Sequence, residues 1–201
     1  MTKNTPALTA LLAGVAIAGS LTVAGCSTQP AGEPSPKPSA SASLPADVNE
    51  ADTMFVSMMI GHHQQAIEMS DIVLAKPELD PGVRDLAKRI KAAQGPEITQ
   101  LKGWLSDWGM ADAGSSSEHG GHAMNGMLSA EQLGRLRSAD GATSSTLFLE
   151  QMIEHHEGAV EMAKPEVADG ANVDVQRLAR SVIDDQSGEI AEMREMLAEL
   201  R

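Results

Sequence analysis

The chain has 201 residues, and its formal net charge at pH 7 is −13. This acidity excludes a typical nucleic-acid-binding protein, because phosphate backbones are bound by clustered Lys and Arg. Apolar residues make up 42 % of the sequence, aromatic residues only 2 %, and tyrosine is absent. A core of Ala, Leu, Ile, Val and Met favours packed helices over a β-sandwich, so we expect an all-α protein.

The N-terminus has the pattern of a bacterial export signal. Lys3 precedes an apolar stretch that begins at Ala7, and small residues lead from there to Cys26. The stretch is too short to span a membrane, which predicts a cleaved signal peptide over residues 1–25. Val23-Ala24-Gly25-Cys26 looks like a lipobox. We therefore expect a lipoprotein whose Cys26 carries palmitate or similar acyl chains and anchors it to membrane lipid on the extracytoplasmic face of the cell membrane.

Residues 26–46 follow as a tether rich in Pro and Ser, a composition that cannot bury a core. Because Cys26 is the only cysteine, no other thiolate remains for metal binding or nucleophilic catalysis. A site for a soft metal would have to be built from Met and His. The folded domain is expected over residues 47–201.

Apolar residues at three- and four-residue steps predict helices along this domain. The expected helices cover about 47–76, 81–108, 129–139, 143–164 and 173–200. Pro77 and Gly109 are predicted to end the first two, and Pro165 the fourth. Pro96 is expected to bend the second. Ser129 begins the short helix with a capping pattern.

The chain contains an internal duplication. Residues 59–69 and 152–162 share the pattern Met-Ile-x-His-His-x-x-Ala-x-x-Met. Repeat one is expected over residues 52–109 and repeat two over 143–201, separated by a linker at 110–128. Two helical hairpins that bury their apolar faces against each other predict a four-helix bundle.

The repeated histidines and methionines are the leading candidates for a metal site. The predicted ligands are His62, His63, His155, His156, Met59, Met69, Met152 and Met162. His62 and His155 fall on the apolar stripes, whereas adjacent helix positions point about 100° apart and place His63 and His156 on the flanks. Imidazole and thioether groups suit a soft, late transition metal such as Cu(I). The alternative is that these side chains only fill the core.

The linker is a second candidate. His119, His122, Met124 and Met127 occur among glycines, where they are able to wrap a Cu(I) ion without a preformed scaffold. The alternative interpretation is a simple spacer between the hairpins.

Signatures of enzymes are missing. A ferritin-like di-metal oxidase needs Glu three residues before a bundle histidine, but Met59, Ile60, Met152 and Ile153 hold those positions. The sequence also lacks a phosphate-binding loop, a nucleophile elbow and a His-Glu-x-x-His motif. We therefore expect a protein that is not an enzyme and needs no organic cofactor.

The doubled His-His motif, together with Gln94-x-x-Glu97-Ile98 and the segment from Gly126 to Ser129, resembles the bacterial domain-of-unknown-function family 305. The resemblance implies a ferritin-like helical bundle that is usually exported, with some members associated with copper handling. One departure is Thr143-Ser144-Ser145-Thr146, where the family more usually has an Asp beside an aromatic residue.

The sequence thus predicts a lipid-anchored, extracytoplasmic protein that binds copper, as Cu(I), for scavenging or transport. Its expected partners are membrane lipid and the metal ion; the sequence identifies no protein partner. The alternative is a structural or partner-binding module whose histidines pack in the core or titrate with pH.

Overall fold

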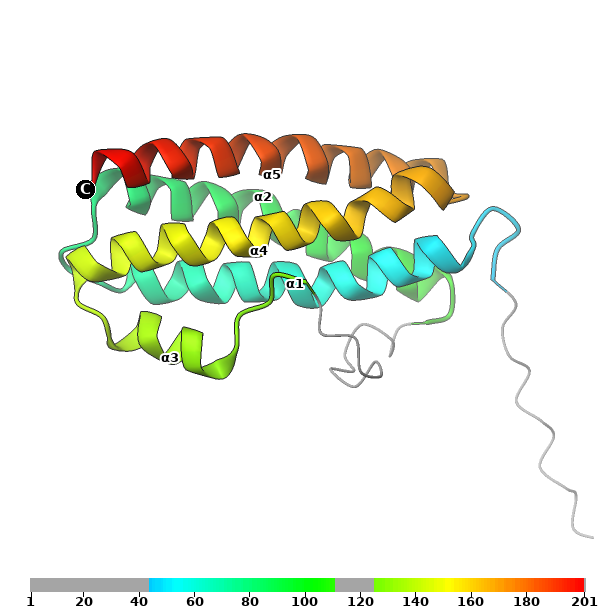
Figure 1. Ribbon diagram of the computed structural model, residues 1–201. Coiled ribbons are helices and arrows are strands. Elements are labelled where there is room, and N and C mark those ends of the chain that lie inside the picture. Colours follow the sequence, from blue (N-terminus) through cyan, green and yellow to red (C-terminus); the bar gives the residue numbers. More distant parts are fainter. Residues whose placement is uncertain (1–43, 111–124, 201) are drawn as a thin grey trace, which may run out of the picture. The chain divides into compact units, whose positions relative to one another are not determined.

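A computed structural model describes residues 44–110 and 125–200, and all regular secondary structure in these two ranges is α-helical. The helices are α1 (Glu50–Leu74), α2 (Pro81–Asp107), α3 (Ala130–Ser138), α4 (Gly141–Asp169) and α5 (Val173–Glu199). The four long helices form a bundle, and the short α3 lies beside α1 and α4 (Figure 1). None of these helices combines the length and apolarity that crossing a membrane requires.

The helix ends follow the local sequence closely. Asn49 begins α1 in a capping box, in which its side chain accepts from the N–H of Asp52 and the Asp52 carboxylate accepts from the N–H of Asn49. Ser129 and Gln132 form the same arrangement at α3, as the sequence predicts. Gly109 follows α2 with a φ of 71°, a left-handed conformation that a glycine adopts without strain.

The expected end of the fourth helix at Pro165 is wrong, because α4 continues through this residue to Asp169. A proline inside a helix leaves the carbonyl four residues earlier without its N–H partner. That carbonyl belongs to Glu161, which is exposed, so water can satisfy it. Helix α2 likewise continues through Pro96.

The two hairpins are tied together at their turns by equivalent residues of the two repeats. The Asp52 carboxylate accepts hydrogen bonds from the N–H groups of Ala171 and Asn172, between α4 and α5. In the other repeat the Ser145 hydroxyl accepts from the N–H of Asp80, between α1 and α2. The serine that departs from the family pattern therefore performs the same anchoring task as the aspartate.

The bundle core is divided by a polar layer. Helix α1 packs on α2, α4 packs on α5, and the two hairpins meet mainly through α1 and α4. One apolar cluster contains Met69, Leu86, Ile90 and Met152, and the other contains Met59, Ile98, Ala159 and Val182. The histidine pairs of α1 and α4 occur in sequence between members of the two clusters, as do Gln94 of α2 and Gln186 of α5. The polar side chains thus meet at one level of the bundle.

Candidate metal centre

All four histidines of the duplicated motif are fully buried in this layer. The rings of His62 and His155 lie against each other, with 3.7 Å between their centroids and 37° between their planes. His155 is also near its neighbour His156, at 6.2 Å between centroids. The predicted approach of the two motifs is therefore observed, and it is closest for the two residues on the apolar stripes.

His63 and His156 face the second helix of their own hairpins, where each contacts a glutamate. The Nε2 atom of His63 lies 2.7 Å from an Oε atom of Glu97 on α2. The Nε2 atom of His156 lies at the same distance from an Oε atom of Glu189 on α5. The second contact has the geometry of a hydrogen bond, whereas the first is less well aligned. The two histidines predicted on the flanks are thus each covered by a carboxylate.

The hydrogen bonds of His62 and His156 indicate which ring nitrogen carries the proton. A neutral imidazole has one N–H and one lone pair, and an oxygen acceptor selects the nitrogen that is protonated. Nε2 faces a glutamate in His63 and His156, and in His62 it lies 3.2 Å from the backbone oxygen of Asn125. The Nδ1 atoms of these three residues are buried without a partner, and in His63 and His155 neither nitrogen makes a hydrogen bond. The layer therefore holds several bare imidazole lone pairs.

Burial keeps the central pair of histidines neutral. Removal from water lowers the pKa of His62 from 6.5 to about 3, and the nearby His63 acts in the same direction. Burial also holds the pKa of His155 well below 6.5, with His62 contributing. A metal ion binds only the deprotonated nitrogen, so these two imidazoles need not lose a proton before they act as ligands.

One side of the layer is closed by the segment 125–128, which leads into α3 and lies between α1 and α4. The Gln65 amide accepts a hydrogen bond from the N–H of Leu128 at 2.7 Å and donates one to its carbonyl at 3.0 Å. Gly158 allows the close approach, because a Cβ atom there would collide with the backbone of Asn125. Asn125 in turn contacts His62. Sequence analysis did not assign Gln65 or Gly158 a role.

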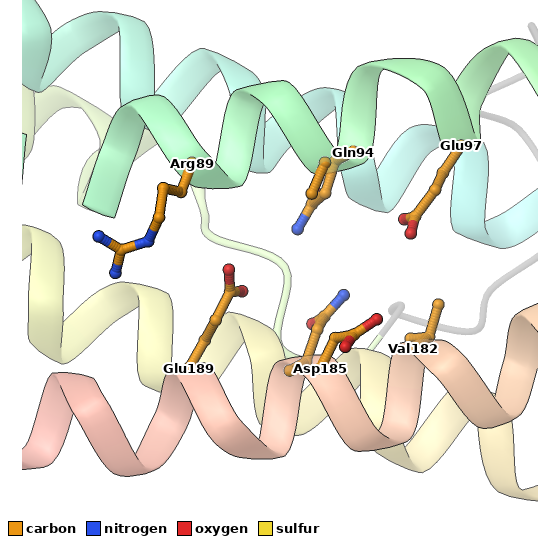
Figure 2. Close-up of a pocket in the computed structure, with 8 residues that line it drawn as sticks. Arg89, Gln94, Glu97, Val182, Asp185 and Glu189 are labelled. Atoms are coloured by element: carbon orange, nitrogen blue, oxygen red, sulfur yellow. The ribbon is translucent and has the colours of Figure 1, made fainter. Parts of the chain in front are cut away.

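The opposite side of the layer borders a cavity between α2 and α5. The cavity has a volume of about 350 Å³, and its lining includes Gln94 and Glu97 of α2 and Gln186 and Glu189 of α5 (Figure 2). Each glutamate side chain is 22 % exposed, although its histidine partner is fully buried. The carboxylates thus lie between solvent and the histidines.

The methionines occupy the apolar clusters on both sides of the layer. Met59 belongs to one cluster with Met162 packed against it, and Met69 and Met152 belong to the other. Of the four methionines in the duplicated motif, each cluster therefore receives one from each repeat. Met127 is partly buried. The linker candidates His119, His122 and Met124 lie outside the described residues, as do Cys26, the signal peptide and most of the tether.

Glu97 and Glu189 are missing from the ligand set predicted from the sequence. Their signal was nevertheless present, because the Glu-Ile pair recurs at 97–98 and 189–190 in the two repeats. Recurrence alone could not show that each carboxylate reaches a histidine, since this depends on the register between the helices of one hairpin.

The donor set suits copper better than a hard metal ion. Within residues 44–110 and 125–200, no three His, Cys, Asp or Glu side chains are already grouped around a point as metal ligands. Cu(I) is bound by imidazole and thioether groups. The unpartnered Nδ1 atoms and the neighbouring methionines are groups of this kind.

The fold and the layer define a helical bundle with side chains of facing helices directed to a common centre. The chain belongs to the family described as "Domain of unknown function (DUF305)", whose model matches residues 52–197. It is 36 % identical to a protein of this family from Streptomyces coelicolor described as secreted, with a TM-score of 0.69 over 78 % of this chain and 94 % of that one. No curated protein matches the sequence.

Solved structures of a copper-binding protein are also similar to this chain. CopM in its Cu(I)-bound form is 30 % identical, with a TM-score of 0.63 over 74 % of this chain and 96 % of that one. Its Cu(II)-bound form gives a TM-score of 0.64, with 75 % and 97 % of the two chains covered. The structural neighbours of this family member thus include a protein that binds copper.

Proposed function

We propose that this protein binds copper outside the cytoplasm, as Cu(I), through the histidine layer, and serves as a carrier or scavenger rather than as an enzyme. The observation that carries the proposal is the set of buried Nδ1 atoms without partners in His62, His63, His155 and His156. A purely structural histidine in a core normally has both nitrogens satisfied, because an unpaired buried polar atom destabilises the fold.

The roles of the layer follow from its geometry. His62 and His155 lie against each other at the centre of the layer, and their low pKa values keep them neutral. Glu97 and Glu189 hold the outer rings from behind, as carboxylates commonly do for metal-binding histidines. The methionines on both sides exclude water and offer thioethers to a soft ion. Similarity to CopM, which has been solved with copper, supports the same metal.

Membrane anchoring through Cys26 belongs to this proposal. The lipobox at the end of an export signal supports it, and a relative described as secreted agrees with a location outside the cytoplasm. Copper would then be held at the cell surface, where thioethers tolerate oxidising conditions better than thiolates.

The alternative is a structural or partner-binding module without metal. In that case His62 and His155 would not act as a pH switch near neutrality, because burial places their pKa values far below it. The unpartnered nitrogens would also remain unexplained.

The test is the Cu(I) affinity measured by competition with a chromogenic chelator. His62→Ala combined with His155→Ala should weaken binding by about tenfold or more, a loss of at least about 1.4 kcal/mol. Gln64→Ala combined with Glu154→Ala is the matched control, since it removes two exposed side chains from the same two helices. An unchanged affinity in the first variant, with a folded bundle by circular dichroism, would rule out the layer as the site.

A further inference from the structure

The cavity between α2 and α5 has the position of an entrance to the histidine layer. These two helices are neighbours, but they share few direct contacts, whereas each packs extensively on the other helix of its hairpin. Arg89, Ala93 and Asp185 line the cavity and are exposed, whereas Gln94 and Val182 are buried in its wall. The cavity therefore extends from the surface toward the buried layer.

The other side of the layer is shut. Segment 125–128 covers the groove between α1 and α4 and is held by both hydrogen bonds of Gln65. Gly126 and Gly158 bring the backbone of this segment against α4 so closely that a Cβ atom on either would meet backbone atoms. Above and below the layer lie the two apolar clusters, whose central members are fully buried. The α2–α5 side, in contrast, is open and lined by residues of the layer itself.

The groups along this path are suited to receive a cation. Glu97 and Glu189 line the cavity, and a carboxylate oxygen of each also contacts a buried Nε2 atom. The Oε1 atoms of Gln94 and Gln186 are buried in the cavity wall without hydrogen-bond partners, so they are free to coordinate an entering ion. Arg89, the one cation in the lining, is paired with Glu192.

From this arrangement we infer that copper enters and leaves through the α2–α5 cavity, with Asp185 attracting the ion and Glu97 and Glu189 passing it to His63 and His156. Each carboxylate has one side chain to share between its histidine and the entering ion, so turning toward the ion means giving up the contact with Nε2. The inference rests on the proposed function but concerns the route and its rate, not the affinity.

The experiment measures the rates of Cu(I) uptake and release by stopped flow with a chromogenic chelator, on the full-length protein. Ala93→Trp fills the opening of the cavity, and Ala92→Trp is its control on the adjacent exposed position, which does not line the cavity. Blocking the path should slow uptake and release together, by about tenfold, and leave the equilibrium affinity unchanged, because the end states are the same. Ala93→Leu repeats the test with a smaller side chain if the indole disturbs folding.

A second pair of variants tests the charge at the entrance. Asp185→Asn should slow uptake by roughly threefold at low ionic strength, and salt should reduce the difference. Asp184→Asn removes the same charge one residue away, outside the lining, and should have a smaller effect.

The outcomes separate the route from the proposed function. If Ala93→Trp and Ala93→Leu exchange copper at the rate of Ala92→Trp while affinity is retained, the cavity is not the path and the inference is wrong. If the wild-type protein binds no copper at equilibrium, the proposed function fails, and the route fails with it.

Discussion

The imidazole rings of His62 and His155, from the two halves of a duplicated sequence, lie 3.7 Å apart in the centre of the bundle. Their helices, α1 and α4, form the main contact between the hairpins, so the two repeats meet at their equivalent histidines. Around this pair the second histidines of each motif turn outward to Glu97 and Glu189. The duplication therefore produces a layer in which the histidine pair and its glutamate partner occur twice.

The glutamates should contribute to copper affinity without binding the ion in the final complex. Glu97→Gln with Glu189→Gln removes the acceptors that fix the protons on His63 and His156, and substitution of such partners typically costs about 10- to 100-fold in metal affinity. The measurement is chelator competition at pH 7. Glu195→Gln, on an exposed position of α5, is the control for loss of acidic charge and should leave the affinity unchanged. Equal affinities in all these proteins would contradict the assigned role.

Glu166 should make the stability of the fold depend on pH. It is 1 % exposed, and burial together with the charge of Asp52 raises its pKa from 4.5 to about 8, whereas Arg180 acts in the opposite direction. Protonated Glu166 is able to donate to Asp52, and Gly170 leaves room for its carboxyl group.

Because the folded-state pKa is the higher one, this stabilisation is complete below about pH 4.5 and is lost as the pH rises through about 8. His62 and His155 act in the opposite direction below about pH 6.5, so urea unfolding of the wild type should show the fall in stability between about pH 6.5 and 8. Glu166→Gln, which stays neutral, should remove most of that fall, whereas Glu199→Gln on an exposed position should not. Identical pH profiles for Glu166→Gln and the wild type would show that Glu166 is ionised in the folded protein.

The close approach of segment 125–128 should depend on Gly158. A Cβ atom there would collide with the backbone of Asn125, and overpacking of this kind typically costs about 1–3 kcal/mol. Gly158→Ala should therefore lower the free energy of unfolding. Gly103→Ala is the matched control, since nothing lies within 4 Å of its added Cβ and the change should stabilise α2 by up to about 1 kcal/mol. A Gly158→Ala variant as stable as Gly103→Ala would show that the segment is not packed this closely.

The prediction that the linker binds Cu(I) is tested by substitutions. A deletion that reached Asn125 would also remove a contact of His62. Replacing His119, His122 and Met124 by serine should lower the number of Cu(I) ions bound per chain and leave the thermal stability of the bundle unchanged. An unchanged copper stoichiometry would show that this linker is only a spacer.

Much of this architecture could be predicted from the sequence because its signals are local or repeated. The helix start at Ser129 depends on side chains three residues apart, and the approach of the histidine pairs follows from the duplication. Pro165 misled the prediction because its ability to end a helix depends on whether water can reach the carbonyl that loses its partner.

Contacts of His63 and His156 could not be predicted in the same way. Which residue of α2 lies opposite His63 depends on the turn between the helices and on the packing of both apolar clusters, not on the motif itself. The closure by segment 125–128 depends in addition on Gly158, whose sequence context resembles that of any helical glycine.

The most direct test of the central claim is ¹⁵N NMR of the histidine side chains during titration with Cu(I) or its diamagnetic substitute Ag(I). A ligand nitrogen loses its free lone pair, so the Nδ1 resonances of His62 and His155 should move strongly at the first equivalent, while their Nε2 resonances change less. Variants with His62→Ala and His155→Ala assign the signals. If the first equivalent of metal binds and all bundle Nδ1 resonances stay in place, the histidine layer is not the copper site.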